Sequence, residues 1–282
     1  MEFRLILDLI DTALKEDLAW GDVTAEGLFD NELEAELALV LREDGVIAGL
    51  DVARLVFQHI VPEAVWTAQC VDGDFLKAGS MLATVKGRAR GLVQSERTAL
   101  NFLQHLSGVA TLTHRYVEVA TKANPNVHVT DTRKTIPGMR YLEKYAVRMG
   151  GGHSHRHCLA DMVMIKDNHL ALLGQQRISL SDAVKRLRSK LGHAVKIEVE
   201  VDRLEQLEEV LAAKVETVLL DNMSLGDLRK AVALIDGRML AEASGGVNLS
   251  TIGDIAATGV DLISVGRLTH SVSALDIGLD YL

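Results

Sequence analysis

The order of apolar and polar residues predicts a mixture of helices and strands in the first third of the chain. Apolar side chains recur at helical spacing near the N-terminus and indicate an amphipathic helix there: Phe3, Ile6, Ile10, Ala13 and Leu14. Residues 33–41 alternate like a half-buried strand, and residues 52–60 have a helical pattern. Short strand-like runs broken by turns fill residues 64–87. These elements predict a small α+β domain.

A long helical pattern follows over residues 94–120. Its apolar positions fall at steps of three and four residues: Ala99, Leu100, Phe102, Leu103, Leu106, Val109 and Leu112. Ser107 and Gly108 are weak helix formers in its middle, so we expect them to divide it into two helices. We place a domain boundary there, which gives domains of residues 1–107 and 108–282.

Beyond Asn126 the pattern becomes a repeat of an apolar run, a polar end and the start of a helix. Ser224 followed by Asp227, for example, resembles a capping box. Strands that alternate with helices over short connections predict a parallel sheet, and polar residues at strand ends are typical of an α/β barrel. Because six such runs are fewer than eight, we predict an open, incomplete α/β barrel; the runs are residues 127–134, 161–169, 196–202, 217–222, 239–246 and 261–270.

Composition places the chain among ordinary globular proteins. It has 282 residues, of which 48% are hydrophobic and 24% charged. Acidic residues interrupt the apolar N-terminal stretch, so we expect neither a signal peptide nor a membrane span. The two cysteines, Cys70 and Cys158, cannot build a disulfide framework, and we therefore expect a cytoplasmic protein.

Positive charge is concentrated between residues 133 and 166, although the whole chain has a net charge of −9. Only Glu143 and Asp161 oppose the lysines and arginines there, which are Arg133, Lys134, Arg140, Lys144, Arg148, Arg156 and Lys166. A nucleic-acid-binding surface would normally spread over a face and give a pI above ~9, so we expect no nucleic-acid partner. Cations at the ends of apolar runs predict instead a pocket for small, multiply charged anions.

Other strand ends carry candidate binding groups. Residues 244–246 and 264–266 follow the last two strands, where barrels commonly bind phosphate through backbone N–H groups. The alternative is that their glycines only make tight turns, but two such loops in adjacent positions favour phosphate. Glu200 and Asp221 end neighbouring strands, and their oxygens suit Mg²⁺ or ribose hydroxyls. Salt bridges to Lys134 or Lys166 are the structural alternative.

The histidines and Lys166 allow more than one interpretation. His153, His155 and His157 lie on one side if the segment is extended, a spacing that can bind zinc. The surrounding cations would repel a divalent ion, so we favour anion binding by His155 and Arg156. Lys166 could form a Schiff base, but with so many cations nearby we favour a fixed positive charge. Nothing in the sequence marks Cys158 as a nucleophile.

Together these residues resemble one known family. The segments DTRKTxPGxRxxEKYAVxxGGGxxHR, IKDNH, EVEV, LLDN, SGGVN and ISVGxLTH are similar to those of quinolinate phosphoribosyltransferase. The N-terminal segments EDLAWGDVT, REDGVIAGL and ERTALNFLQHLSGVAT match as well, so the resemblance covers nearly the whole chain. Each motif is weak alone, whereas the ordered set is specific.

The resemblance implies a fold, an activity and roles for particular residues. The fold is an N-terminal α/β sandwich and an open α/β barrel, with about the last ten residues returning to the N-terminal domain. The activity transfers phosphoribosyl from 5-phosphoribosyl-1-pyrophosphate to quinolinate, with release of pyrophosphate and CO₂, and gives nicotinate mononucleotide for de novo NAD biosynthesis. Mg²⁺ is expected and no organic cofactor is.

The same resemblance assigns the site. The quinolinate pocket would contain Arg133, Lys134, His155, Arg156 and Lys166. Arg97 would enter from a neighbouring subunit, which makes a homodimer the smallest active unit. Glu200 and Asp221 would hold the ribose and Mg²⁺, and Lys134, Lys166, Glu200 and Asp221 would serve catalysis. The 5-phosphate would bind at Ser244, Gly245, Gly266 and His270.

The chain departs from the family pattern at two places. His157 and Cys158 replace an apolar residue and a glycine, which adds bulk beside the expected pyridine pocket, and Arg267 replaces a small residue. These changes motivate a second hypothesis, in which the acceptor is another pyridine acid or base. A third hypothesis is a non-catalytic, phosphosugar-binding or regulatory protein, but pure binding would not need both the carboxylate pair and the lysines.

Overall fold

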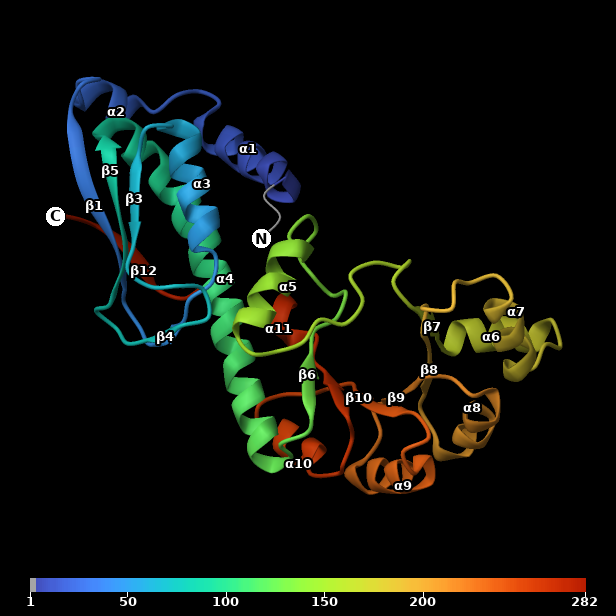
Figure 1. Ribbon diagram of the computed structural model, residues 1–282. Coiled ribbons are helices and arrows are strands. Elements are labelled where there is room, and N and C mark those ends of the chain that lie inside the picture. The colour runs from blue at the N-terminus through green and yellow to red at the C-terminus, as the bar shows by residue number, and fades with distance from the viewer. Residues whose placement is uncertain (1–3) are drawn as a thin grey trace. The chain divides into compact units, whose positions relative to one another are not determined.

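The computed structural model describes residues 4–282, which form two compact units (Figure 1). Unit 1 contains the described part of Met1–His114 together with Thr135–Gly151 and Leu268–Leu282. Unit 2 contains Arg115–Lys134 and Gly152–Arg267. Helices α4 (Ala89–Ala123) and α11 (Arg267–His270) include residues of both units.

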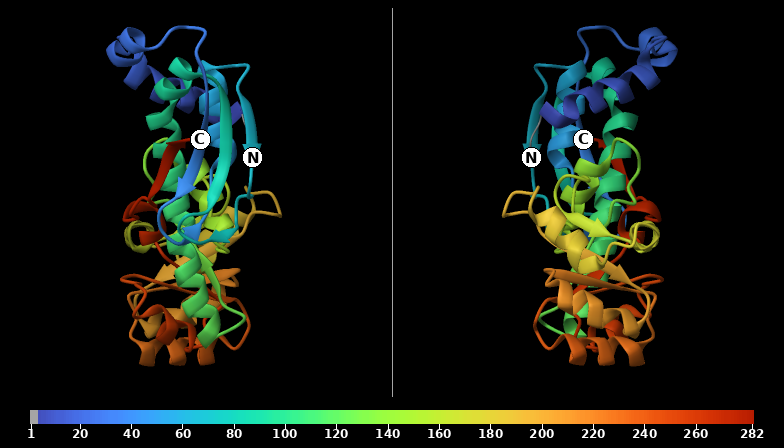
Figure 2. Two further views of the ribbon diagram at one scale, coloured as in Figure 1. Left: turned by 90° about the vertical axis from the view of Figure 1, so that its left-hand side faces the viewer. Right: turned by 90° about the vertical axis from the view of Figure 1, so that its right-hand side faces the viewer.

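Unit 1 is built on an antiparallel sheet with the strand order β12-β1-β5-β3. Its strands are β1 (Glu34–Leu41), β3 (Val65–Ala68), β5 (Met81–Arg88) and β12 (Ile277–Tyr281), and a small second sheet pairs β2 (Gly45–Val46) with β4 (Phe75–Leu76). Helix α3 (Leu50–Ile60) and the first part of α4 lie along one face of the larger sheet (Figures 1 and 2). The other helices of the unit are α1 (Arg4–Leu18), α2 (Val23–Leu28) and α5 (Arg140–Met149). This is the expected α/β sandwich.

The apolar stripes predicted for this unit form its core. Ile6, Ile10 and Leu14 on α1 are at most 3% exposed, as their helical spacing predicted, whereas Phe3 lies outside the described residues. The last strand, β12, pairs with β1 from Leu37 opposite Tyr281 to Leu41 opposite Ile277, so the end of the chain completes this sheet.

The predicted break in the long helix is wrong, because α4 continues through Ser107 and Gly108 without interruption. Both residues are explained by close packing inside unit 1. The Ser107 hydroxyl accepts a hydrogen bond from the Ala48 N–H at 3.1 Å. A Cβ atom at Gly108 would lie 2.2 Å from the Ser273 carbonyl oxygen. Small residues are therefore needed at these positions so that other parts of unit 1 can pack against the helix. In the sequence alone, small residues needed for packing look the same as residues that end a helix.

We predict that Gly108→Ala lowers the free energy of unfolding by about 2 kcal/mol, because the added methyl group overpacks a backbone contact. The measurement is urea unfolding of both proteins. Gly27→Ala in α2 is the matched control, since nothing lies within 4 Å of the added Cβ there. It should be neutral or slightly stabilising. Equal stability of Gly108→Ala and the wild type would contradict the packing explanation.

Unit 2 contains the six parallel strands that the sequence predicts, in the order β6-β11-β10-β9-β8-β7. The strands are β6 (His128–Thr130), β7 (Val163–Ile165), β8 (Ile197–Val201), β9 (Thr217–Asp221), β10 (Leu240–Ser244) and β11 (Leu262–Ser264). The connecting helices are α6 (Asp167–Gln175), α7 (Leu180–Arg188), η1 (Leu204–Gln206), α8 (Leu207–Ala213), α9 (Leu225–Ile235) and α10 (Ile252–Ala256). Because β6 and β7 are the two ends of the sheet, the barrel is open, as expected.

Local sequence signals explain several of these elements. Ser224 caps α9 through a hydrogen bond from the Asp227 N–H, which confirms the predicted helix start. On β8, Ile197, Val199 and Val201 are buried, and Glu198 and Glu200 alternate with them. Among residues 4–282, no helix is both long and apolar enough to cross a membrane.

Candidate functional site

A cavity of about 410 Å³ opens where the strands of unit 2 end. It brings together most of the site residues that the sequence singled out: Arg133, Lys134, His155, Arg156, Lys166, Glu200, Asp221 and Ser244. Gly245 and Gly266 follow β10 and β11 in the same unit but do not line the cavity. Arg97 and His270 belong to unit 1, so their assigned roles stay predictions.

Two arginines give the cavity its positive character. The pKa of Arg156 is lowered by burial and by the nearby charge of Arg133, so the two guanidinium groups repel each other. The Nε of Arg133 is buried and has no hydrogen-bond partner among the described residues. An unused buried donor beside a second guanidinium is an arrangement that an anion would satisfy.

Lys166 is held at the end of β7 by the helix that follows. Its backbone N–H donates to His169 Nδ1 at 3.0 Å in the first turn of α6. Its Nζ forms an ion pair with Glu200, so the salt bridge considered from the sequence is present. A Schiff base requires the neutral amine, whereas a carboxylate partner stabilises the ammonium form. The geometry therefore favours the fixed-charge interpretation.

The loop after β9 fixes the second carboxylate. Asn222 has a φ of +53°, a left-handed conformation that asparagine tolerates, and its Nδ2 donates to Asp221 Oδ2 at 2.7 Å. The Asn222 N–H donates to the Ser244 carbonyl at 2.9 Å, which joins the ends of β9 and β10. Gly245 has a φ of +91°, and a Cβ atom there would lie 2.2 Å from Asn222 Oδ1. Glycine is therefore required for this close approach.

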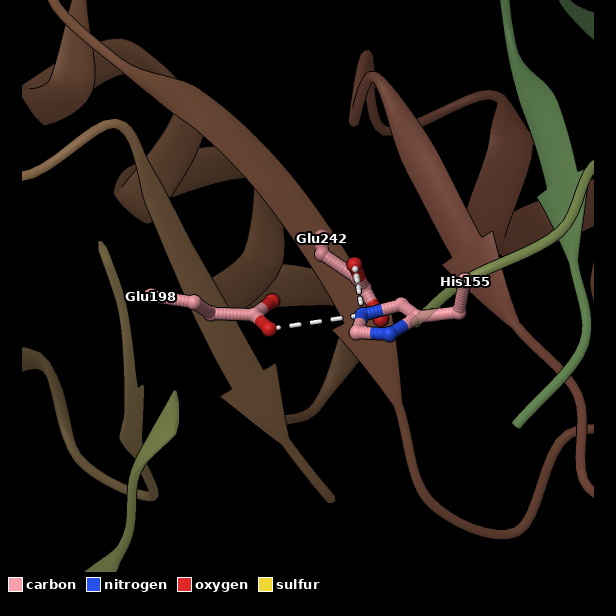
Figure 3. A group of neighbouring side chains, drawn as sticks. All are labelled: His155, Glu198 and Glu242. Atoms are coloured by element: carbon pink, nitrogen blue, oxygen red, sulfur yellow. Dashed lines mark ion pairs between the residues drawn. The ribbon is translucent and has the colours of Figure 1, made fainter. Parts of the chain in front are cut away.

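The three histidines of the segment after α5 do not converge. The His153 ring contacts the ring of His128 in a tilted arrangement, with centroids 4.3 Å apart, and the His157 backbone N–H donates to Asp161 at 2.5 Å. His155 alone points toward the barrel interior, where it meets Glu198 and Glu242 (Figure 3). The zinc interpretation of the three histidines thus has no geometric support.

Glu198 and Glu242 are site residues that the sequence pattern did not single out. They are 0% and 1% exposed and lie on β8 and β10, two residues before Glu200 and Ser244. Residues two positions apart on a strand lie on the same face, so both glutamates could have been found from their spacing to the predicted strand-end residues. Together with His155 they form the one group in the described part of the chain that has the composition of a metal site.

Contacts within this group change the protonation of its members. Burial lowers the pKa of His155, but contacts with Glu198 and Glu242 outweigh it and raise the value to about 10. Burial raises the pKa of Glu198, contact with His155 lowers it, and the charge of Glu242 raises it again, to about 7. With a pKa of about 10, the His155 ring is positively charged at neutral pH and faces the two carboxylates.

The residues that depart from the family pattern lie away from the cavity lining. Cys158 is exposed, and the backbone N–H groups of His157 and Cys158 both donate to Asp161 Oδ2. Neither side chain lines the cavity, and neither does Arg267. The side chains of His157 and Cys158 thus belong to a surface loop and do not add bulk beside the expected pyridine pocket.

An open α/β barrel whose mouth combines arginines, lysines and two carboxylates defines the class of enzymes that bind phosphorylated, multiply charged small molecules. Comparison with known proteins narrows this class. Residues 22–107 match the model of the quinolinate phosphoribosyl transferase N-terminal domain, and residues 109–280 match that of the C-terminal domain. The chain belongs to the quinolinate phosphoribosyltransferase family, which confirms the resemblance inferred from its motifs.

Individual relatives agree with this assignment. The chain is 44% identical over 287 residues to the nicotinate-nucleotide pyrophosphorylase (carboxylating) of Mycobacterium leprae, with 99% of this chain and 98% of the relative covered. It is 39% identical to a probable enzyme of the same name from Bacillus subtilis, over 96% of this chain and 92% of the relative. Among solved structures, NadC from Streptococcus pyogenes superposes with a TM-score of 0.93 at 41% identity, covering 100% of this chain and 98% of that one. The nicotinate-nucleotide pyrophosphorylase from Francisella tularensis gives 0.93 at 36% identity, with 100% and 98% covered.

Proposed function

We propose that the cavity at the carboxyl ends of the unit 2 strands holds quinolinate and 5-phosphoribosyl-1-pyrophosphate together. The chain is a carboxylating nicotinate-nucleotide pyrophosphorylase: it transfers phosphoribosyl to quinolinate and produces nicotinate mononucleotide, pyrophosphate and CO₂ in NAD biosynthesis. The observation that carries the residue assignment is the division of charge in the cavity. Arg133 and Arg156 line the cavity and repel each other, whereas Lys166 is paired with Glu200.

Arg133 and Arg156 bind the two carboxylates of quinolinate. Planar guanidinium groups match carboxylates in a bidentate manner, and the buried Arg133 Nε supplies a donor that the described part of the protein leaves unused. Lys134 lies at the same mouth, held by a hydrogen bond from its N–H to Thr132 Oγ1 at 3.0 Å. With Lys166 it provides charge for the substrate carboxylate and the leaving pyrophosphate.

Glu200 and Asp221 have the donor set that suits Mg²⁺. The ion typically takes one or two protein carboxylates plus substrate phosphates, and these two side chains end neighbouring parallel strands. Bound Mg²⁺ would neutralise charge that develops on the pyrophosphate. The same carboxylates accept hydrogen bonds from ribose hydroxyls, and Asn222 fixes the orientation of Asp221 for either contact.

The reaction follows from this arrangement. The quinolinate nitrogen bonds to C1 of the ribose as the bond from C1 to the pyrophosphate oxygen breaks, and the electron pair leaves with pyrophosphate. The ring nitrogen then carries a positive charge. When the bond between C2 and its carboxylate breaks, CO₂ leaves, the electron pair remains at C2 beside that charge, and C2 takes up a proton. Fixed orientation and counter-charge are the contributions of the protein.

We place the 5-phosphate at Ser244, Gly245 and Gly266 of unit 2, whereas the role expected for His270, which belongs to unit 1, stays a prediction. Ser244 lines the cavity, and the left-handed backbone at Gly245 and Gly246 turns the loop after β10 at this edge. Glycine loops at the last strands of a barrel commonly bind phosphate.

We predict that Gly245→Ala raises KM for 5-phosphoribosyl-1-pyrophosphate at least about tenfold, because the added methyl group displaces the Asn222 side chain and the loop. Steady-state kinetics with each substrate varied in turn would measure this. Gly246→Ala is the matched control, since its φ of +61° is similarly unusual but nothing lies within 4 Å of its Cβ. Equal KM values in the two variants would contradict the phosphate assignment.

The enzyme acts as a homodimer in the cytoplasm. Arg97 lies on α4 as an exposed side chain at an open cavity of unit 1, also lined by Glu16 and His105, which leaves it available to a second subunit. Both cysteines are free thiols, as a reducing compartment would keep them. Arg97→Ala in a mixed dimer with an inactive subunit would test whether the arginine serves the neighbouring site.

The acceptor is tested by measuring initial rates with quinolinate and nicotinate in parallel, with 5-phosphoribosyl-1-pyrophosphate and Mg²⁺ present. We expect product from quinolinate and no product from nicotinate. Turnover of nicotinate alone would support the altered-acceptor hypothesis. Tight binding of both substrates without turnover would indicate a binding protein.

A further inference from the structure

His155 is held by three carboxylates that come from three different strands of unit 2 or their ends. Its backbone N–H donates to Oδ1 of the buried Asp131, directly after β6, at 2.9 Å. Its ring Nε2 lies 3.3 Å from Glu198 Oε2 on β8 and 3.4 Å from Glu242 Oε2 on β10 (Figure 3). His155 thus contacts residues on or directly after β6, β8 and β10.

The two glutamates occupy positions where a barrel normally has apolar side chains. Both are at most 1% exposed, and burying a carboxylate is costly unless a partner compensates for it. The four carboxylate oxygens have no hydrogen-bond partner among the described residues. The compensation is therefore the positive charge of His155, whose Nε2 lies within ion-pair distance of both carboxylates. Such a costly arrangement indicates a function beyond filling the core.

The other ring nitrogen also lies against the protein, because Nδ1 is 2.8 Å from the backbone nitrogen of Arg156. The ring is therefore held at both nitrogens, by two carboxylates at Nε2 and by the Arg156 backbone at Nδ1. A positive charge on the ring is what two buried carboxylates require, and contacts with them raise the pKa of His155 to about 10.

The segment that contains His155 also carries Arg156. It pairs with β6 through a parallel bridge between Thr130 and His153. On the other side, Arg156 Nη1 donates to the Met162 carbonyl at 3.3 Å, and Nη2 lies 3.2 Å from Met164 Sδ on β7. The segment thus spans the open side of the barrel between its two end strands.

We propose that Glu198 and Glu242 are positioning residues of the quinolinate pocket, which act through His155 to fix the Arg156 guanidinium. In this arrangement both His155 ring nitrogens are engaged within the protein, and the ring anchors the segment that carries Arg156. The kinetic consequence rests on the proposed function, whereas the hydrogen-bond arrangement of His155 does not.

The direction in which quinolinate affinity changes when the two glutamates lose their charge distinguishes a positioning role from simple electrostatic repulsion. Two carboxylates near an anion-binding pocket repel quinolinate, so their removal should tighten quinolinate binding if charge alone mattered. If they position Arg156, their removal should weaken binding. Substitution of glutamate by glutamine removes the charge at nearly constant volume and is therefore the appropriate change.

We expect Glu198→Gln and Glu242→Gln each to raise the Kd for quinolinate about tenfold, the size of one weakened charge-assisted hydrogen bond. KM for 5-phosphoribosyl-1-pyrophosphate should stay within about twofold of the wild-type value. Glu208→Gln, at an exposed position on α8, is the control for loss of one negative charge. Calorimetric titration of the full-length enzyme with quinolinate measures the first quantity and steady-state kinetics the second. Unchanged or tighter quinolinate binding in both variants would overturn the proposal.

Two further measurements keep the outcome interpretable. Nitrogen NMR of histidine-labelled enzyme, assigned with a His155→Gln variant, should show a protonated Nε2 at neutral pH, with the Nε2 signal shifted in both glutamine variants. Because the two glutamates bind the same nitrogen, either variant suffices if the other fails to fold. A metal ion at one per chain in purified enzyme, lost in Glu198→Gln, would contradict the proposal. If the wild type bound no quinolinate while the NMR pattern held, the proposed function would fail and the anchoring of His155 would stand.

Discussion

Replacement of Arg156 by alanine is expected to lower kcat/KM for quinolinate about a thousandfold, the largest effect of any single change in the cavity. The guanidinium is partly buried beside Arg133, whose charge opposes its own, so substrate carboxylates are natural partners for the pair. Its removal leaves a substrate carboxylate buried without a counter-charge. Steady-state kinetics with quinolinate varied at saturating 5-phosphoribosyl-1-pyrophosphate would measure the loss.

Arg156→Lys is the matched control for this experiment. Lysine restores the positive charge but not the planar fork, so we expect it to recover part of the loss and to remain well below the wild type. Full recovery by lysine would show that charge suffices and that bidentate geometry is unimportant. A loss of less than about tenfold in Arg156→Ala would remove Arg156 from the carboxylate-binding group.

Asp221→Asn is expected to lower kcat at least about a hundredfold and to weaken the dependence of the rate on Mg²⁺. The substitution is nearly isosteric, and the new side chain keeps an oxygen that can accept the hydrogen bond from Asn222 Nδ2. The loop between β9 and α9 should therefore keep its conformation, and the effect reports loss of the charge. Rates measured over a range of Mg²⁺ concentrations would separate lost metal binding from lost chemistry.

The Glu200→Gln variant provides a comparison for the same role. Glu200 is paired with Lys166, so its neutralisation also releases a lysine that we assign to the leaving group. We expect a rate loss of the same order in both variants. An unaltered Mg²⁺ profile in both would show that these carboxylates bind ribose hydroxyls and do not hold the metal.

The sequence predicts most of the barrel because its strands carry two independent signals. Each of the six strands is an apolar run, and each ends in polar residues before a helix start such as the one at Ser224. Short connections then require parallel strands, and parallel strands bring their carboxyl ends to one edge. For this reason the strand order along the chain is enough to group the residues at those ends, which are Lys134, Lys166, Glu200 and Asp221.

Two features could not be predicted because they depend on contacts between distant parts of the chain. Gly108 was expected to end a helix, but it is required by the approach of the Ser273 carbonyl. Glu198 and Glu242 were not assigned, because the sequence does not show that an unrelated segment places His155 between them. Side-chain alternation gives the face of a strand on which a residue lies, but it does not identify what that residue meets there.

The departures from the family pattern at His157 and Cys158 also show that sequence neighbourhood does not give the position of a side chain. Next to His155 and Arg156 in the sequence, they were expected to crowd the pyridine pocket. In the structure their backbone N–H groups turn onto Asp161, and the side chains do not line the cavity. Neighbouring residues in an extended segment point in opposite directions, and a turn separates them further.

A single-turnover reaction with quinolinate labelled with ¹³C in its 2-carboxylate tests the central claim most directly. Enzyme in excess over quinolinate, with 5-phosphoribosyl-1-pyrophosphate and Mg²⁺, should release one labelled CO₂ and one pyrophosphate for each nicotinate mononucleotide formed. Arg156→Ala should release neither on the same timescale. Formation of a nucleotide that keeps the label, or release of pyrophosphate without CO₂, would contradict the assignment of this cavity to decarboxylating phosphoribosyl transfer.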